Sequence, residues 1–321
     1  MGSTAPIIEA NGLVKTFPSR TQHERIRAVD GVDLSVAPNE MFGLVGPDGA
    51  GKTTILRLLN GLLLPDAGRA TVAGYDAASQ SLEIHARAGY MAQQFSLYGD
   101  LSVYENIAFF ARIYGVGRAV RQERIDRLLE FARLNPFRSR PAAKLSGGMK
   151  KKLALACMLV HEPEVVFLDE PTTGVDPVSR REFWDLLSSL RVERKLTMVL
   201  STPYMDEAER CHRVGLLYRG RLIATGTPAE IKSLVPGQLL ELRAADWQRA
   251  KELLGAAEGV LEVQTYGDRL HVFVDDADRR APQLAQTLAR QRIACQPPRR
   301  MAPRLEEAFV SLIRREGERQ T

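Results

Sequence analysis

The sequence predicts an α/β protein whose first domain holds a largely parallel sheet covered by helices on both faces, with an antiparallel section at its front. Residues 7–45 are β-rich, and after Gly51 helical patterns alternate with short apolar runs that are typical of buried strands. A Pro-Gly break at residues 236–237 ends this alternation. We therefore expect one domain at residues 1–235 and a smaller α+β domain at residues 236–321.

Hydrophobic periodicity assigns the elements of the first domain. Apolar residues recur at helical spacing over residues 52–63, whereas residues 164–171 form a short apolar run of the buried-strand type. The expected strands are 7–17, 28–40, 41–46, 66–77 (a hairpin or strand pair), 164–171, 197–202, 213–220 and 221–226. The expected helices are 52–63, 102–134 with an interruption at 114–117, 147–162, 178–194 and 205–211.

The second domain is predicted to have the β-α-β-β-α-β order of ferredoxin-like folds, followed by one more helix. The expected strands are 239–244, 260–266, 269–275 and 293–297, and the expected helices are 246–256, 281–291 and 304–315.

The composition is that of a globular protein, with 45% hydrophobic and 26% charged residues among 321. The net charge of +5 permits contact with nucleotides, nucleic acids or anionic membranes and selects none of them. We interpret the arginine-rich stretches at residues 297–304 and 311–319 as solvated surface, and expect no nucleic-acid partner.

The cysteines and the apolar stretches indicate a protein of the cytosol. Cys157, Cys211 and Cys295 lack C-x-x-C spacing, which fits reduced thiols and indicates neither a disulfide framework nor a zinc site. The first twelve residues lack the pattern of a secretory signal. The longest apolar stretches, such as residues 58–65, are too short to span a bilayer, so another chain must cross any membrane at which this protein acts.

Residues 46–53 (GPDGAGKT) match the phosphate-loop pattern G-x-x-x-x-G-K-T between an apolar strand and a helix. Such glycines let successive backbone N–H groups face an anion at a helix N-terminus, although a glycine turn can also merely join strand to helix. Lys52 can reach the β- and γ-phosphates of a nucleotide, and the Thr53 hydroxyl suits Mg²⁺. The predicted nucleotide-binding residues of the loop are Gly46, Asp48, Gly49, Gly51, Lys52, Thr53 and Thr54.

Two further segments carry groups suited to phosphate chemistry. The apolar strand at residues 164–171 ends in Asp169 and Glu170; one carboxylate there can hold Mg²⁺ through water while the other polarises the attacking water. Residues 145–156 (LSGGMKKKLALA) start a basic helix, whose free N-terminus is either a second phosphate-binding device or a plain helix cap. The candidate residues of this turn are Ser146, Gly147 and Gly148.

With these motifs, the sequence resembles the ATP-binding subunits of ABC transporters over about residues 7–235, in family order. The matching features are Phe17 as the base-stacking aromatic, residues 46–53 as Walker A, Gln93 as the Q-loop glutamine, residues 145–149 as the signature, residues 165–171 as Walker B and residues 173–176 as the D-loop. The resemblance implies a P-loop NTPase core with a RecA-like parallel sheet, an antiparallel β subdomain and an α-helical subdomain.

The resemblance also implies a role for each residue, because in this family two such domains pair head to tail around ATP. Each ATP then lies between the Walker A loop of one domain and the signature of the other. The implied roles are adenine stacking for Phe17, phosphate and Mg²⁺ binding for Lys52 and Thr53, completion of the metal shell for Gln93, Mg²⁺ binding for Asp169, and general base for Glu170. Ser146 with Gly148 would clamp the γ-phosphate of the opposite site, with Gly147 between them in the signature turn.

The segment after residue 235 resembles the C-terminal appendage of subunits that serve ABC-2 type exporters, although its final helix is equally consistent with plain packing. The implied function is a transport-coupled ATP hydrolase that uses ATP and Mg²⁺. Its implied partners are a second ATP-binding domain, identical or different, and transmembrane permease subunits. It is therefore expected in the cytoplasm, peripheral on the inner face of the cell membrane, with a substrate chosen by the permease.

Pro203 departs from the family, in which histidine usually follows the Ser-Thr at the end of the last core strand. Proline cannot donate a hydrogen bond, and losing one preorganised donor to transition-state charge costs on the order of 10²–10³-fold in rate in other enzymes. We therefore hypothesise a weakened hydrolysis site on this chain, with a competent one completed on a partner. The alternative is that a neighbouring group, such as the Tyr204 hydroxyl, substitutes for the histidine.

Two other function classes stay open on the sequence. One is a regulatory ABC ATPase without a membrane partner, whose members usually carry two ATPase domains or long coiled-coil insertions that are not evident here. The other is a catalytically degenerate ATP-binding half that completes a partner's site, which Pro203 favours and Glu170 argues against.

Overall fold

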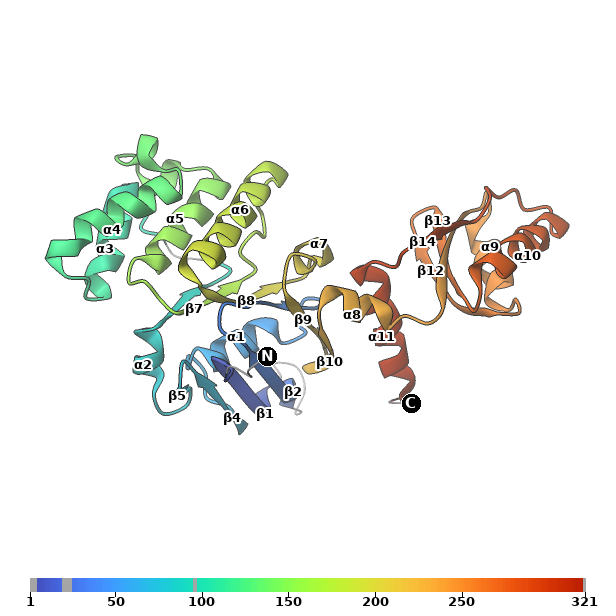
Figure 1. The fold of residues 1–321 in the computed structure, drawn as a ribbon, viewed down its shortest axis with the longest axis horizontal. Helices are drawn as coiled ribbons and strands as arrows, with labels where there is room; N and C mark the ends of the chain where they lie inside the picture. The colour runs from blue at the N-terminus through green and yellow to red at the C-terminus, as the bar shows by residue number, and fades with distance from the viewer. Residues whose placement is uncertain (1–4, 19–24, 95–96, 320–321) are drawn as a thin grey trace. The chain divides into compact units, whose positions relative to one another are not determined.

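A computed structural model describes residues 5–18, 25–94 and 97–319, which form two compact units divided between residues 225 and 226. The N-terminal residues 1–4, part of the segment in which we expect no secretory signal, lie outside the described residues. Figure 1 labels the helices and strands of both units.

The first unit contains ten strands, seven α-helices and two short 3₁₀ helices among its described residues. The strands are β1 (Ile8–Pro18), β2 (Arg25–Val36), β3 (Met41–Val45), β4 (Ala67–Val72), β5 (Tyr75–Asp76), β6 (Ala88–Met91), β7 (Val165–Asp169), β8 (Thr197–Thr202), β9 (Arg213–Tyr218) and β10 (Arg221–Gly226). The helices are α1 (Lys52–Leu59), α2 (Ser81–His85), α3 (Val103–Ile113), α4 (Arg118–Phe131), η1 (Asn135–Phe137), η2 (Ala142–Lys144), α5 (Gly147–Leu159), α6 (Pro177–Arg194) and α7 (Met205–Ala208).

A six-stranded sheet of order β10-β9-β3-β8-β7-β6 forms the centre of the first unit. Its pairs β3/β8, β3/β9, β7/β8 and β6/β7 are parallel. Every residue of β3, β7 and β8 is buried, as expected for parallel strands that are covered on both faces. Because these strands run in the same direction, their carboxyl ends meet at one edge, where ligands of open α/β sheets bind.

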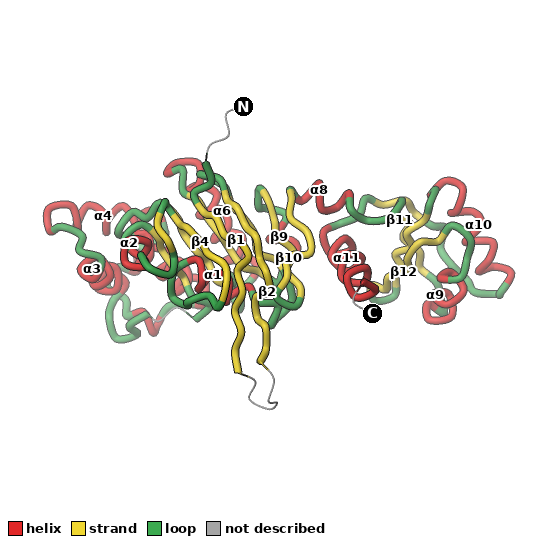
Figure 2. Tube along the Cα trace, turned by 90° about the horizontal axis from the view of Figure 1, so that it is seen from below, coloured by secondary structure: helices red, strands yellow, loops and turns green. Residues whose placement is uncertain are grey.

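A second sheet of order β2-β1-β4-β5 is antiparallel and supplies the predicted antiparallel section. Figure 2 shows its two longest strands, β1 and β2, running side by side. One hydrophobic core joins the two sheets through α1: it contains Ile8 and Val29 from the antiparallel sheet, Ile55 from the helix, and Phe42 and Phe167 from the parallel sheet. This core holds the start of α1 at the edge of the parallel sheet.

The helices α3, α4 and α5 pack against one another, and α5 also packs against α6 (Figure 1). Helix α3 begins with a complete capping box, in which Ser102 Oγ accepts from Glu105 N and Glu105 Oε2 accepts from Ser102 N. Nine of the thirteen residues of α5 are buried, so this helix is firmly packed.

The second unit is a four-stranded antiparallel sheet of order β12-β13-β11-β14 with helices on both faces. This strand order is the one that a ferredoxin-like β-α-β-β-α-β chain produces. Its elements are α8 (Pro228–Ser233), β11 (Gln238–Arg243), α9 (Trp247–Gly255), β12 (Val260–Tyr266), β13 (Arg269–Val274), α10 (Ala277–Arg290), β14 (Arg299–Met301) and α11 (Leu305–Arg319).

The two faces of this sheet are covered in different ways. Leu242, Val272 and Leu284 belong to an apolar core between the sheet and helices α9 and α10. Helix α11 carries buried apolar residues such as Leu305 and Ala308, and it also meets β12 and β13 through polar groups: Ser311 Oγ donates to Glu262 Oε2 at 2.6 Å, and Glu307 Oε1 lies 3.0 Å from His271 Nδ1. Helix α11 also contacts α8, which is why α8 belongs to the second unit.

The structure differs from the expectations above at several points. The elements β6, α2 and α8 were not predicted, and two further differences concern the second unit. The expected strand at residues 293–297 is not part of the sheet ladder; Cys295 makes only an isolated bridge to Ala244, and pairing resumes at Arg299. The prolines at 297 and 298 have no N–H to donate, so the strand forms after them. The compact units divide at residue 225, whereas the sequence analysis put the domain boundary after residue 235, beyond α8.

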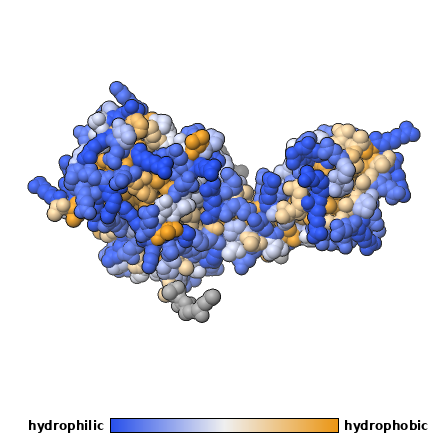
Figure 3. Space-filling model, turned by 45° about the horizontal axis from the view of Figure 1, so that its top comes forward, coloured by the Kyte–Doolittle hydropathy of each residue, from blue (hydrophilic) through white to orange (hydrophobic). Residues whose placement is uncertain are grey.

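None of the helices in the described residues combines the length and the hydropathy needed to cross a membrane. The face of the molecule seen in Figure 3 is mostly hydrophilic, with small separate hydrophobic areas.

Packing in the second unit predicts unequal effects of truncating two leucines of one hairpin. Leu270 on β13 is fully buried, whereas Leu261 on β12 is 52% exposed. Leu270→Ala is expected to lower the free energy of unfolding by about 2–5 kcal/mol because it leaves a cavity. Leu261→Ala, the matched control, is expected to change it by less than about 0.5 kcal/mol. Urea denaturation followed by circular dichroism measures both, and equal losses would contradict this packing.

Candidate nucleotide-binding site

The loop between β3 and α1 requires glycine at several positions. Gly49 and Gly51 have φ angles of 77° and 107°, in the left-handed region. A Cβ on Gly51 would lie 2.2 Å from the Ala28 carbonyl oxygen, and one on Gly46 would lie 2.2 Å from that of Leu217. Only glycine fits these positions without moving the backbone, so the sequence pattern and the loop geometry agree.

The N-terminus of α1 is open to an anion. Among the described residues, no side chain caps α1, and its first turn contains no acidic residue. The backbone N–H groups of this turn therefore have no intrahelical partner, and the helix dipole adds positive charge at the same point. Asp48 lies beside it, but its side chain is 94% exposed and 4.0 Å from Lys52 Nζ, so solvent screens this pair.

Lys52 is the cation of the loop and is almost fully buried. Its Nζ donates to the carbonyl oxygens of Gly46 at 2.8 Å and Pro47 at 3.1 Å, and lies 3.4 Å from Glu170 Oε1. Only 4% of the residue is exposed. A buried ammonium group needs negative partners, and phosphate oxygens at the open end of α1 are of that kind.

Asp169, the last residue of β7, joins three elements. Its Oδ1 accepts from Thr53 Oγ1 at 2.9 Å and from Ser201 Oγ at 2.7 Å, and its Oδ2 accepts from Tyr90 OH at 3.3 Å. Burial raises the pKa of Tyr90, which keeps this phenol protonated and able to donate. The Asp169 carboxylate is thereby held next to the Thr53 hydroxyl in the first turn of α1.

Glu170 follows Asp169 directly in the chain, and its carboxylate is also held by several contacts. Gln93 Nε2 donates to its Oε2 at 2.9 Å, and Thr173 Oγ1 lies 3.3 Å from that oxygen. Its backbone N donates to Ser201 Oγ at 3.0 Å, and its φ angle is 44°, a strained value for a residue with a side chain. Several contacts therefore hold this carboxylate in a fixed direction.

One cavity unites most of the residues that the sequence analysis singled out. It is lined by Phe17 from β1, Ala28, loop residues 48–54, Gln93 and Glu170. Gly46 and Asp169 lie directly behind it through their bonds to Lys52 and Thr53. The cavity thus brings together an aromatic ring, an anion-binding loop and the Glu170 carboxylate.

The oxygens at the loop suit a magnesium ion that is shared with phosphates. Mg²⁺ is usually held by one or two protein groups and completes its shell with water and phosphate oxygens. Thr53 Oγ1 and Asp169 Oδ1 are 2.9 Å apart, and Gln93 lines the same cavity. Within the described ranges there is no cluster of three or more His, Cys, Asp or Glu residues that would form an all-protein cage.

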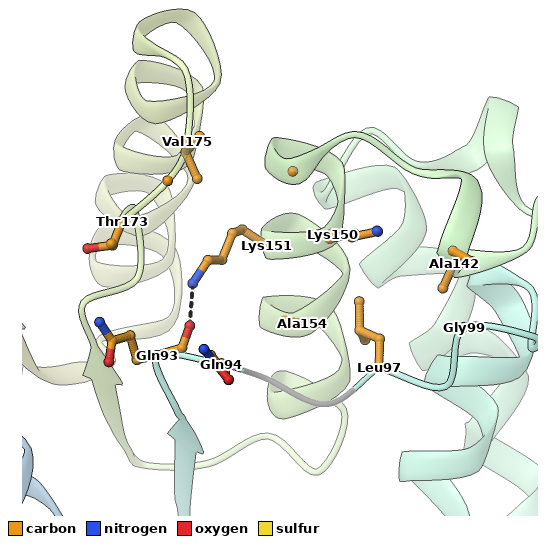
Figure 4. A pocket seen from close by; sticks show the side chains of 13 residues that line it. Gln93, Gln94, Leu97, Gly99, Ala142, Lys150, Lys151, Ala154, Thr173 and Val175 are labelled. Carbon is orange, nitrogen blue, oxygen red and sulfur yellow. Dashed lines mark hydrogen bonds between the residues drawn. The ribbon is translucent and has the colours of Figure 1, made fainter.

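The signature residues do not line this cavity. Ser146 caps α5, with its Oγ accepting from Met149 N at 3.3 Å, and a Cβ on Gly148 would lie 2.4 Å from Ser179. Gly147 lines a second cavity, shown in Figure 4, together with Gln93 and Lys151. Within one chain, the structure therefore keeps the signature apart from the phosphate loop.

Pro203 follows β8, and neither it nor Tyr204 lines the nucleotide cavity. Thr202, the residue before it, accepts from Gly46 N through its carbonyl oxygen at 3.4 Å and from Tyr204 N through its Oγ1 at 3.0 Å. The Tyr204 ring packs on the Arg180 guanidinium, 4.6 Å from the ring centroid. The tyrosine side chain is thus engaged on α6.

Sequence reasoning assigned no role in the site to Tyr90, Ser201 and Glu207, and it named Thr173 only as part of the D-loop. Glu207 is 1% exposed and accepts from Thr202 Oγ1 at 2.7 Å and from Thr172 Oγ1, so it ties the end of β8 to the loop after Glu170. The sequence signal that could have identified some of them was a hydroxyl side chain on a strand next to β7, such as Tyr90 on β6 and Ser201 on β8. Their partners depend on strand register, which the sequence does not reveal.

Comparisons with known proteins agree with this geometry. A family model described as ABC transporter matches residues 29–173. The chain is 46% identical over 227 residues to "Probable multidrug ABC transporter ATP-binding protein YbhF" of Escherichia coli (strain K12), covering 71% of this chain and 38% of that protein. It is 38% identical over 311 residues to "Nod factor export ATP-binding protein I" of Paraburkholderia xenovorans (strain LB400), covering 96% and 97%.

Solved structures share this fold over 68% and 72% of the chain. A dimeric ATP-binding cassette, MJ0796, bound to ADP and Pi, aligns with a TM-score of 0.62 at 25% identity over 68% of this chain and 98% of that one. The cbiO1 protein from Clostridium perfringens, part of the transporter complex cbiONQ, aligns with a TM-score of 0.64 at 26% identity over 72% and 92%. The predicted fold class is confirmed, and the chain belongs to the ABC transporter family of ATP-binding proteins.

Proposed function

We propose that this chain binds and hydrolyses ATP to power an ABC-2 type membrane exporter. The observation that carries the proposal is the convergence of Lys52, Thr53, Gln93, Asp169 and Glu170 at one edge of the parallel sheet. The names of the relatives support export as the direction of transport, because they include a Nod factor export protein and a daunorubicin/doxorubicin resistance protein.

ATP binding would use the loop, the lysine and the aromatic ring. The N–H groups at the start of α1 and Lys52 Nζ are suited to the phosphates, and Phe17, which lines the same cavity, is suited to stacking on the adenine. Thr53, Asp169 and Gln93 would hold Mg²⁺. When bound, the ion neutralises the charge that develops on the β- and γ-phosphates.

Hydrolysis would use Glu170 as the general base. Its carboxylate is held by Gln93 and Thr173, and it follows the Mg²⁺-binding candidate Asp169 directly. A carboxylate fixed in this way can orient a water molecule in line with the γ-phosphate and accept its proton. The strained backbone of Glu170 is of a kind that clusters at active sites.

A second ATP-binding domain would complete the site. The phosphate loop covers one side of the cavity, and Ser146 and Gly148 of the same chain lie outside it. A signature turn from a partner domain would supply a second helix N-terminus to the γ-phosphate and exclude water from the reacting groups. The dimeric form of the MJ0796 cassette supports this arrangement.

The membrane partners and the second unit complete the proposal. We propose that permease subunits hold the protein at the inner face of the cell membrane and select the substrate. On the sequence-based boundary, residues 236–321 would be the accessory domain of an ATP-binding domain at residues 1–235; the compact unit that contains this region begins at residue 226. The similarity to the Nod factor export protein, which extends over 96% of this chain, includes this region.

Pro203 favours one refinement of this function, a weakened hydrolysis site on this chain beside a competent site on a partner. A proline at the end of β8 supplies no donor to the γ-phosphate. Tyr204, the candidate substitute, packs on Arg180 and does not line the cavity. The ATP-binding loop is intact, so a chain that binds ATP tightly and hydrolyses it slowly fits these observations.

The general-base role predicts the effect of an isosteric change. Glu170→Gln should retain ATP binding and lower single-turnover hydrolysis by roughly 10²–10⁴-fold, because the amide cannot accept the proton. Glu164→Gln, just before the start of β7, is the control, since its carboxylate is 58% exposed and lies 3.6 Å from the Arg87 guanidinium. Equal hydrolysis by Glu170→Gln and wild type would contradict the role.

The weakened-site refinement predicts a gain of function. Pro203→His should raise the turnover of the purified chain by at least about tenfold, because it restores a donor to the γ-phosphate. Pro203→Ala also removes the pyrrolidine ring and restores the backbone N–H, but it adds no side-chain donor. The turnover of this variant should therefore stay at the wild-type level. Brisk wild-type turnover that Pro203→His leaves unaltered would overturn the refinement, as would equal gains from both variants.

A further inference from the structure

A lysine on the signature helix reaches the loop that carries Gln93. Lys151 Nζ, one turn into α5, donates to the carbonyl oxygen of Gln93 at 2.9 Å, as Figure 4 shows. Gln93 Nε2 in turn donates to Glu170 Oε2 at 2.9 Å. Two hydrogen bonds therefore connect α5 to the carboxylate that we propose as the general base.

The helix that carries this lysine is a rigid support. Most of α5 from residue 152 onward is buried, and Lys152 forms an ion pair with Glu182 on α6. The same helix begins at the signature turn, where Ser146 is its N-cap. A side chain mounted on such an element can fix a loop more accurately than one mounted on another loop.

Lys151 is half-buried, and its ammonium group is directed at the Gln93 carbonyl oxygen. An ammonium group that donates to a carbonyl oxygen makes a stronger hydrogen bond than a neutral donor.

The neighbouring Lys150 provides a contrast within the same cavity. Its side chain is exposed and points away from Gln93 (Figure 4). Of these two adjacent lysines on one helix, only Lys151 donates a hydrogen bond to Gln93, so Lys150 serves as a matched control.

We propose that Lys151 is a positioning residue that holds the Gln93 backbone so that the Gln93 amide reaches Glu170, and so couples the signature helix to this chain's own hydrolysis site. The proposal rests on the proposed function for its catalytic consequence. A movement of α5 on pairing with a second ATP-binding domain would pass through Lys151 to Gln93 and then to Glu170. Neither the phosphate loop nor Asp169 takes part in this connection.

Three variants test the proposal in the purified full-length chain with Mg·ATP. Lys151→Met keeps the length of the side chain but removes the donor, and should lower kcat roughly tenfold, since small misplacements of catalytic groups have effects of this order or larger. The KM for ATP should change by less than about twofold, because the phosphate contacts of the loop remain. Lys151→Arg, which keeps a cationic donor, should restore part of kcat, and Lys150→Met should leave kcat unchanged.

Amide hydrogen exchange of a peptide that covers residues 90–94 gives a readout that does not require turnover. This peptide should exchange faster in Lys151→Met than in wild type, and Lys150→Met should match wild type. Equal exchange in the two methionine variants, or equal kcat, overturns the proposal. A wild-type chain that neither binds nor hydrolyses ATP would instead overturn the proposed function, and the exchange comparison would still decide whether Lys151 holds the loop.

Discussion

The hydrogen bonds between Ser201 and the end of β7 are the constraint on which the site depends. Ser201 Oγ donates to Asp169 Oδ1 at 2.7 Å and accepts from Glu170 N at 3.0 Å, so one buried hydroxyl fixes both residues. Its place opposite Asp169 follows from the parallel register of β7 and β8. Because Asp169 also contacts Thr53, this register brings the phosphate loop and the carboxylates to one edge of the sheet.

The parts of the site that could be predicted from the sequence are those fixed by local structure. The loop from Gly46 to Thr53 is a strand-turn-helix unit whose glycines are required by its own backbone, and Asp169 and Glu170 end a strand recognisable by its apolar run. The ferredoxin-like order of the second unit was also predictable, since alternation of short strands and helices is a local signal.

The remaining parts depend on contacts between segments far apart in the chain. Tyr90, Ser201 and Lys151 reach the site only through strand register or helix packing, which one sequence does not specify. The last strand of the second unit was predicted at the wrong residues. Residues 293–297 have a strand-like pattern, but Pro297 and Pro298 cannot donate to the ladder, so the pairing moves to β14. Local patterns thus identify the reacting groups, and tertiary contacts determine what orients them.

We propose that the cavity next to α1 binds ATP through Lys52 and a magnesium ion at Thr53 and Asp169. Equilibrium titration of the purified chain with a fluorescent ATP analogue, with Mg²⁺ or with EDTA, tests it most directly. Removal of Mg²⁺ is expected to weaken ATP binding by at least about tenfold, and Lys52→Met is expected to weaken it similarly because a charge-assisted contact is lost. An ATP affinity that neither EDTA nor Lys52→Met changes would show that this cavity does not bind Mg·ATP in this way.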